Sequence, residues 1–255
     1  MTRDMLTVCL PPTDPADVPD ALAAAMAPFW YDAEIPSGGV WQGEWDWWHI
    51  FGGDGAAGLA VRAGYEADLR LARNPLWSDG SLRPSQPAER CDGGPRGLLD
   101  LDRDRAPAAD AAGADWDGWA AFSADFEPAL SQRAMTESVP PGPDAGNRAY
   151  AAFYEQPLIR AAAAWRAGDL QAPWWTRVSD PVAHFTGGRE QYVRRVASRV
   201  VPTNVLLTLD GEWLDGTLNA LEPGALVGHR YFDFADRYLD ALAEDALMVR
   251  IRFHS

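Results

Sequence analysis

Acidic and imidazole side chains alternate with tryptophans between residues 41 and 49, in the stretch WQGEWDWWH. Carboxylates and imidazoles act as general acids and bases in enzymes. Indole rings offer large flat faces against which a ligand or a partner packs. The stretch therefore predicts a site whose acid–base residues are Glu44, Asp46 and His49. The predicted ligand-binding residues of the same site are Trp41, Trp47 and Trp48.

Core packing is the competing interpretation of these tryptophans, of which the chain has 12. If the stretch is a strand, its side chains alternate between two faces, so Trp47 and Trp48 point in opposite directions. One face must then cover the core, and the other either lies under a helix or forms the site. Because no catalytic spacing is present, the sequence favours a binding or interaction protein with a tryptophan-rich acidic surface. The alternative is a small-molecule or glycan-directed enzyme.

A second candidate binding site is the segment GHRYF, where His229, Arg230 and Tyr231 follow one another. A guanidinium beside an imidazole and a phenol suits an anionic group. No pair among the four histidines has i, i+4 or H-x-H spacing, so we predict no metal site. The sequence also contains no G-x-S-x-G, H-E-x-x-H or S-x-x-K motif. No cofactor is predicted.

Gly53, Gly55 and Gly58 form a literal G-x-G-x-x-G. A dinucleotide-binding fingerprint needs an apolar parallel strand before the glycines and a helix directly after them. Here the preceding segment WDWWHIF is half polar, and the following LAVRAG reaches Gly64 too soon for a helix. We expect a turn between two paired strands, without a bound dinucleotide.

The composition excludes several classes of protein. The chain has 37 acidic and 22 basic residues, and every one of the latter is arginine. Without lysine, pyridoxal enzymes and ordinary P-loop NTPases are excluded, because both need one. A net charge of −15 disfavours nucleic acids and anionic membranes as partners. It allows a small molecule or a basic protein partner, and it leaves the oligomeric state open.

The N-terminal segment MTRDMLTVCLPP lacks a long apolar run, so we expect neither a signal peptide nor a membrane anchor and a cytoplasmic location. The two cysteines have no C-x-x-C spacing, which argues against a disulfide framework.

The elements that must position these residues are clearest near the two ends of the sequence. We predict a strand over 6–10, a helix over 14–29, a hairpin over 204–216, a helix over 230–245 and a strand over 246–253. This pattern predicts an α+β fold with an antiparallel or mixed sheet, helices on one face and a ferredoxin-like sandwich. The first and last strands are expected to share that sheet.

The middle of the chain is harder to interpret. Residues 74–114 are dense in Pro, Gly, Asp and Arg and are predicted to form a loop-rich insertion. Helices are expected within residues 115–167. We therefore predict a single domain over residues 1–255 that carries this insertion.

Three segments resemble a family of uncharacterised proteins from actinobacteria and their phages. WDWWHIFGG resembles that family's WDWY-x-IGGRW segment, REQYVRRVASRVVPTNVLLTLDGEW is similar to its helix and strand pair, and FADRYLDALAEDALMVRIRFHS to its closing helix and strand. The chain departs from the pattern at Phe51 and Asp54. The resemblance implies a phage-related origin and the same closing elements, but the family has no established activity to carry over.

Overall fold

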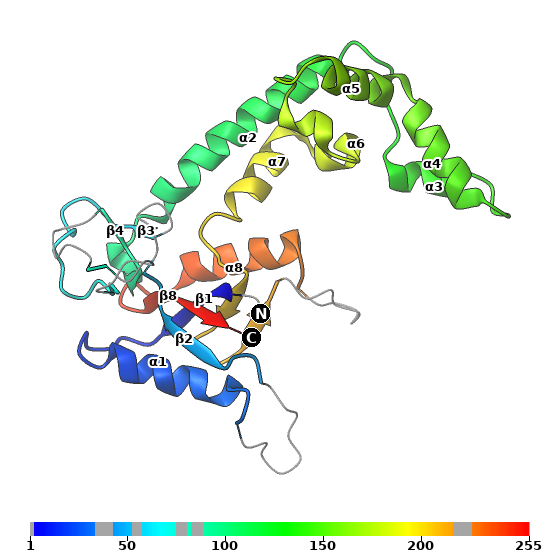
Figure 1. The fold of residues 1–255 in the computed structure, drawn as a ribbon. Coiled ribbons are helices and arrows are strands. Elements are labelled where there is room, and N and C mark those ends of the chain that lie inside the picture. Colours follow the sequence, from blue (N-terminus) through cyan, green and yellow to red (C-terminus); the bar gives the residue numbers. More distant parts are fainter. Residues whose placement is uncertain are drawn as a thin grey trace. The chain divides into compact units, whose positions relative to one another are not determined.

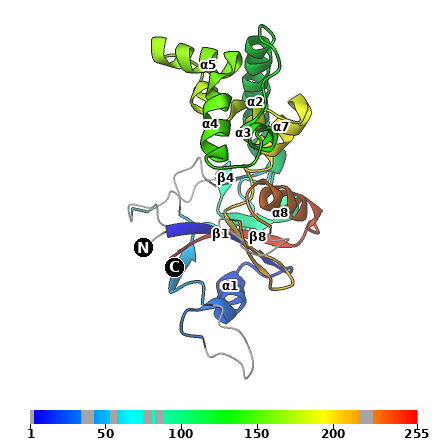
Figure 2. The ribbon, with the colours of Figure 1, turned by 90° about the vertical axis from the view of Figure 1, so that its right-hand side faces the viewer.

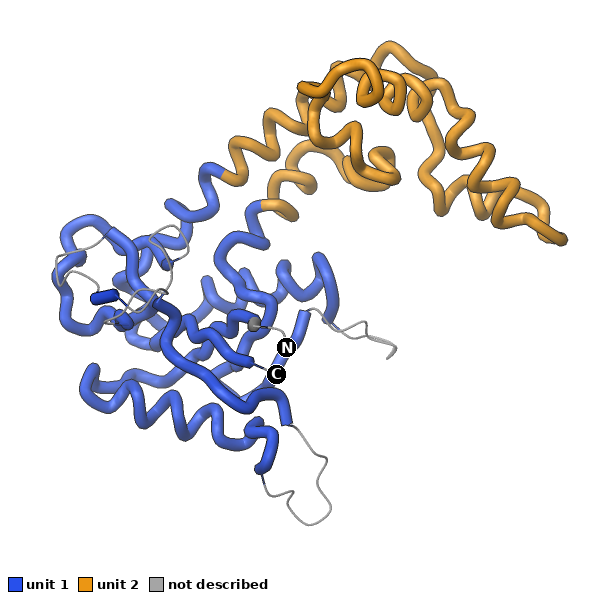
Figure 3. Tube along the Cα trace, viewed as in Figure 1, with its two compact units in different colours: residues 1–107, 197–255 blue, residues 108–196 orange. Residues whose placement is uncertain are grey.

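The computed structural model describes residues 3–33, 43–52, 58–74, 81–82, 89–216 and 226–254. Its contacts divide the chain into two compact units, shown in Figure 3. Unit 1 comprises residues 1–107 and 197–255, and unit 2 comprises residues 108–196. The single domain predicted from the sequence thus resolves into one discontinuous unit and one continuous unit inserted in it.

Unit 1 is built on a six-stranded mixed sheet. Its path runs through β2 (Trp47–Ile50), β8 (Leu247–His254), β1 (Arg3–Leu10), β6 (Val205–Leu207) and β7 (Trp213–Asp215), and β5 (Gly93–Pro95) also pairs with β8. β1 is antiparallel to β8 and parallel to β6. The α+β class, the mixed sheet and the pairing of the first strand with the last are confirmed.

A helix packs on each face of this sheet. α1 (Val18–Met26) and α8 (His229–Ala241) lie on opposite sides of it in Figures 1 and 2. Leu6 and Val8 of β1 pack in the core with α1, which we call the α1-side core, whereas Cys9 packs with α8 in the α8-side core.

Two details of the predicted arrangement are therefore wrong. The helices do not share one face, because β1 is apolar on both faces and each face needs a cover. The sheet is also not ferredoxin-like. In that split arrangement another strand separates the two parallel strands, whereas β1 and β6 are hydrogen-bonded neighbours here.

The glycine motif does not join two strands of a hairpin. β2 pairs with β8, whereas β3 (Leu59–Ala60) pairs with β4 (Arg90–Cys91) in a separate two-stranded sheet. Gly53 and Gly55 lie outside the described residues. A Cβ on Gly58 would lie 2.8 Å from the Cys91 carbonyl oxygen, so close backbone packing accounts for this glycine.

Residues 101–114, predicted as part of a loop-rich insertion, form the first half of α2 (Leu101–Ser123). The segment contains Pro107, but its many alanines have the highest helix propensity. After α2 the chain continues through α3 (Gln132–Ser138), α4 (Ala145–Glu155), α5 (Pro157–Gly168), α6 (Pro181–His184) and α7 (Gly188–Ala197). Short 3-10 turns occur at Ala27–Phe29, Arg96–Leu98 and Trp174–Arg177.

Unit 2 has an aromatic core of its own. Trp119 stacks on Phe185 with ring centroids 5.3 Å apart, and it meets Trp175 edge-on at 5.5 Å. Tyr192 of α7 is buried beside Phe185. Several of the tryptophans are thus accounted for by packing. Among the described residues, no helix combines the length and the apolar surface needed to cross a membrane.

Candidate functional site

The three predicted acid–base residues meet different neighbours. Glu44 lies before β2, where its backbone N–H donates to the carbonyl oxygen of Phe29 at 2.7 Å. Asp46 accepts a hydrogen bond on Oδ1 from Nδ1 of His254 at 2.6 Å. His49 has its Nδ1 3.3 Å from the side-chain amide of Asn74. The contacts given by the described residues thus lead the three side chains or backbones to different partners.

Glu44 lines a pocket of about 440 Å³ with Phe29, Glu212 and Trp213. Burial raises the pKa of the Glu44 carboxyl, and the nearby Asp215 carboxylate raises this pKa further. Phe29 and Trp213 pack with ring centroids 5.0 Å apart. Glu44 is thus a carboxylate in an acidic and aromatic setting.

The tryptophans of this region divide between core and surface. Trp48 packs against the α1-side core, whereas Trp47 is 48% exposed and lies 4.7 Å from the His49 ring. Trp45 also packs against the α1-side core, and its indole N–H donates to the Met26 carbonyl. It precedes the first residue of β2, so strand alternation does not extend to it. Trp41 lies outside the described residues.

The residues of GHRYF do not form one site either. Tyr231 is buried in the α8-side core, where its hydroxyl donates to the Thr203 carbonyl at 2.9 Å. Burial is the main cause that raises the pKa of this phenol. His229 and Arg230 are exposed at the start of α8.

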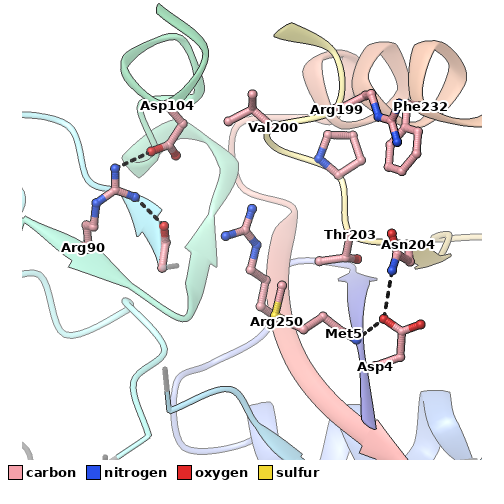
Figure 4. Close-up of a pocket in the computed structure, with 12 residues that line it drawn as sticks. Asp4, Met5, Arg90, Asp104, Arg199, Val200, Thr203, Asn204, Phe232 and Arg250 are labelled. Carbon is pink, nitrogen blue, oxygen red and sulfur yellow. Dashed lines mark hydrogen bonds and ion pairs between the residues drawn. The ribbon is translucent and has the colours of Figure 1, made fainter. Parts of the chain in front are cut away.

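A pocket that the sequence did not indicate lies in unit 1 and has a volume of about 470 Å³. Figure 4 shows its lining, which comes from the start of β1, Gly58, β4, α2, the segment 199–204, α8 and β8. Three guanidinium groups line it, from Arg90, Arg199 and Arg250. We call it the arginine pocket.

Arg250 is the buried cation of this pocket, with 6% of the residue exposed. Its neighbours in sequence, Val249 and Ile251, belong to the α1-side core. Because side chains alternate along β8, Arg250 therefore lies on the α8 side of the sheet. Its Nη2 donates to the Val201 carbonyl at 2.7 Å. Burial lowers the pKa of the guanidinium to about 10, so Arg250 remains charged at neutral pH.

Arg90 and Arg199 differ in how they are held. Arg90 forms an ion pair with Asp104 at 2.8 Å and donates to the Gly58 carbonyl. Asp104 accepts in addition the backbone N–H of Ala60 at 3.0 Å. The Arg199 guanidinium lies over the Phe232 ring, 4.9 Å from its centroid, and the residue is exposed.

The pocket carries two carboxylates, of Asp4 and Asp104, against its three arginines. Asp4 accepts on Oδ1 from the Met5 backbone N–H at 2.7 Å and from the Asn204 side-chain amide at 3.1 Å. The lining therefore has a formal charge of +1, from three arginines and two aspartates, in a chain with a net charge of −15. An anion is the ligand that this excess attracts.

No protein-family model, no curated protein and no solved structure matches the chain. Within the residues that the structure describes, no group of three or more His, Cys, Asp or Glu side chains is arranged to hold a metal ion. The assignment of the site therefore depends on its geometry. The arginine pocket could not be predicted from the sequence, because its residues are scattered from Asp4 to Arg250. One local signal was available, an arginine inside the apolar strand LMVRIRFH.

Proposed function

We propose that this protein binds a small anionic molecule in the arginine pocket. The observation that carries the proposal is the convergence of three arginines, one of them buried, on a single pocket. The Val201 carbonyl holds the Arg250 guanidinium in place, so its positive charge is fixed at the pocket beside those of Arg90 and Arg199. Guanidinium groups also match the planar oxygen pairs of carboxylates and phosphates.

The size of the pocket supports a small molecule as the ligand. Pockets that bind small molecules measure about 300–1,000 Å³, and this one measures about 470 Å³. Enzymatic chemistry is less well supported, since Glu44, Asp46 and His49 do not converge. We therefore propose binding, and assign no reaction.

A second candidate function is the binding of a basic protein partner through the tryptophan-rich surface around β2. Trp30, Tyr31 and Trp47 are 44%, 57% and 48% exposed. Trp30 forms a β-bridge with Trp45, and Tyr31 donates its backbone N–H to the Trp45 carbonyl, so the backbone of Trp30 and Tyr31 lies beside the residues that precede β2. The exposed Asp46 supplies negative charge there.

The proposal is tested by isothermal titration with inorganic phosphate, sulfate and acetate. We expect saturable binding of at least one of these anions to the native protein. Arg199→Gln should weaken it about tenfold, because a hydrogen bond to a charged group contributes about 1.5–3 kcal/mol. Arg199 is the best position for this test because it is exposed and forms no ion pair with any residue that the structure describes, so its loss should spare the fold.

Arg237→Gln is the matched control. Arg237 is an exposed arginine of α8, the helix whose Phe232 ring lies under Arg199, and it donates to the Asp233 carbonyl. This variant should bind the anions as the native protein does. If both substitutions weakened anion binding equally, the loss would follow from the change in net charge and not from the pocket. An absence of anion binding to the native protein would refute the proposal.

A further inference from the structure

The lining of the arginine pocket includes a carboxylate that a simple anion would not use. Asp4 and Asn204 stand at the starts of the parallel strands β1 and β6, where they are joined by a 3.1 Å hydrogen bond. In Figure 4 this pair lies on one side of Arg250, and the ion pair of Arg90 and Asp104 lies on the other. The two carboxylates of the pocket are therefore in different situations.

Asp104 is neutralised by Arg90, whereas Asp4 is held by uncharged donors. Both hydrogen bonds to Asp4 reach Oδ1, from the Met5 N–H and the Asn204 amide. Among the residues that the structure describes, none donates to its Oδ2, and none forms an ion pair with it. The carboxylate is thus oriented by its neighbours and retains capacity to accept hydrogen bonds from a ligand.

A bare anion in this pocket would gain from the arginines and would be repelled by Asp4. A ligand that has hydroxyl groups next to its anionic group avoids this conflict, because a hydroxyl donates to a carboxylate. Asn204 adds an amide that both donates and accepts, which suits a second hydroxyl. The arginine-rich part favours phosphate, since three guanidinium groups exceed what one carboxylate can engage with its two oxygens.

We infer that the ligand of the arginine pocket is a phosphorylated polyol, whose phosphate is bound by the arginines and whose hydroxyl groups are bound by Asp4 and Asn204. This inference rests on the proposed function, because it needs the pocket to bind anions. The same chemistry occurs in a free sugar phosphate and in the ribose phosphate of a nucleotide. Both fit the class, and the experiment separates them.

The test compares four probes by isothermal titration: inorganic phosphate, ribose, ribose 5-phosphate and adenosine 5′-monophosphate. We expect ribose 5-phosphate or the nucleotide to bind at least tenfold more tightly than phosphate, and ribose alone not to bind. A tenfold preference is the contribution of about one hydrogen bond to a charged group. The tighter of the two phosphate esters identifies the source of the ligand.

Asp4→Asn is the decisive variant, because it keeps the shape of the side chain and removes its charge. The preference for the phosphate ester over phosphate should fall at least tenfold, while the affinity for phosphate itself should stay equal or rise. Asp20→Asn, which replaces an exposed aspartate of α1 on the other side of the sheet, should change neither affinity. Thermal unfolding of each variant shows whether it is folded.

The outcomes separate this inference from the proposed function. If phosphate binds and Arg199→Gln weakens it, but the phosphate esters bind no better than phosphate, anion binding stands and the polyol is refuted. A preference that survives Asp4→Asn also overturns the assignment to Asp4. If none of the anions binds the native protein, the proposed function fails and this inference fails with it. Should Asp4→Asn unfold the chain, Asn204→Ser serves as the second variant and should reduce the same preference.

Discussion

Glu44 illustrates how the position of one side chain changes the chemistry expected from its sequence context. In the sequence it is one of three acid–base residues near a tryptophan strand, but in the structure it faces the pocket of Phe29, Glu212 and Trp213. Burial and then Asp215 raise its pKa, which means that its charged form is disfavoured in the folded protein. The ionised carboxylate therefore costs stability at neutral pH.

Replacing Glu44 with Gln should reveal this cost as a pH dependence. Because the pKa is raised by folding, the native state holds the proton more tightly than the unfolded state, and stability falls as the pH rises through the interval above the ordinary value of 4.5. Glu44→Gln should be more stable than the native protein at pH 7, and the difference should vanish in acid. Urea unfolding at several pH values measures it.

Glu190→Gln, at an exposed position of α7, provides the control for this series. The difference in stability between this variant and the native protein should not grow as the pH rises from acid to pH 7. A Glu44→Gln variant that is less stable at pH 7 than in acid, relative to the native protein, would contradict the expected sign.

At the scale of elements, the helices and strands that could be predicted are those whose sequences have a strong local periodicity. Spacings of three and four residues between apolar side chains predicted α1 and α8, and β-branched runs predicted β1, β6 and β8. The two-sided cover of the sheet was missed because tertiary packing decides which face each helix covers, and no local pattern shows it. The pocket was missed because its residues meet only through tertiary structure.

The backbones of β5 and β8 approach each other so closely at Gly93 that no side chain fits there. A Cβ on Gly93 would lie 2.3 Å from the carbonyl oxygen of Met248, a residue of the interior strand β8. Gly93→Ala should therefore destabilise unit 1 by about 2–3 kcal/mol, the order found for overpacked cores. Chemical denaturation followed by tryptophan fluorescence measures the loss.

Gly146→Ala is the matched substitution in a helix. Gly146 lies in α4, and a Cβ there has nothing within 4 Å. Alanine is favoured over glycine in helices, so this variant should be as stable as the native protein or slightly more stable. If Gly93→Ala were equally harmless, the close approach of β5 to β8 would be wrong.

At the scale of the whole molecule, unit 2 interrupts unit 1 in sequence, and the described residues that line the arginine pocket all belong to unit 1. The first turns of α2 belong to unit 1, where Arg105 pairs with Asp236 at 2.7 Å and with Asp240 at 3.0 Å. These contacts fasten the start of α2 to α8. Unit 1 thus holds both its core and its candidate site.

We therefore expect unit 1 to fold after residues 108–196 are replaced by a flexible linker. The shortened protein should unfold cooperatively and bind phosphate with an affinity close to that of the native protein. Calorimetry and isothermal titration check the two statements. A shortened protein without a cooperative transition would show that unit 1 depends on unit 2 for its stability.

The parallel pairing of β1 with β6 has a consequence for the order of events during synthesis. β1 pairs with β6 and with β8, and both of these strands are translated after the whole of unit 2. The first strand therefore leaves the ribosome long before either of its partners is available. Unit 2 is continuous in sequence and can fold while β1 is still unpaired. Until residues 247–254 emerge, the apolar strand LTVCL keeps at least one edge open, and an unpaired strand edge in a nascent chain favours aggregation.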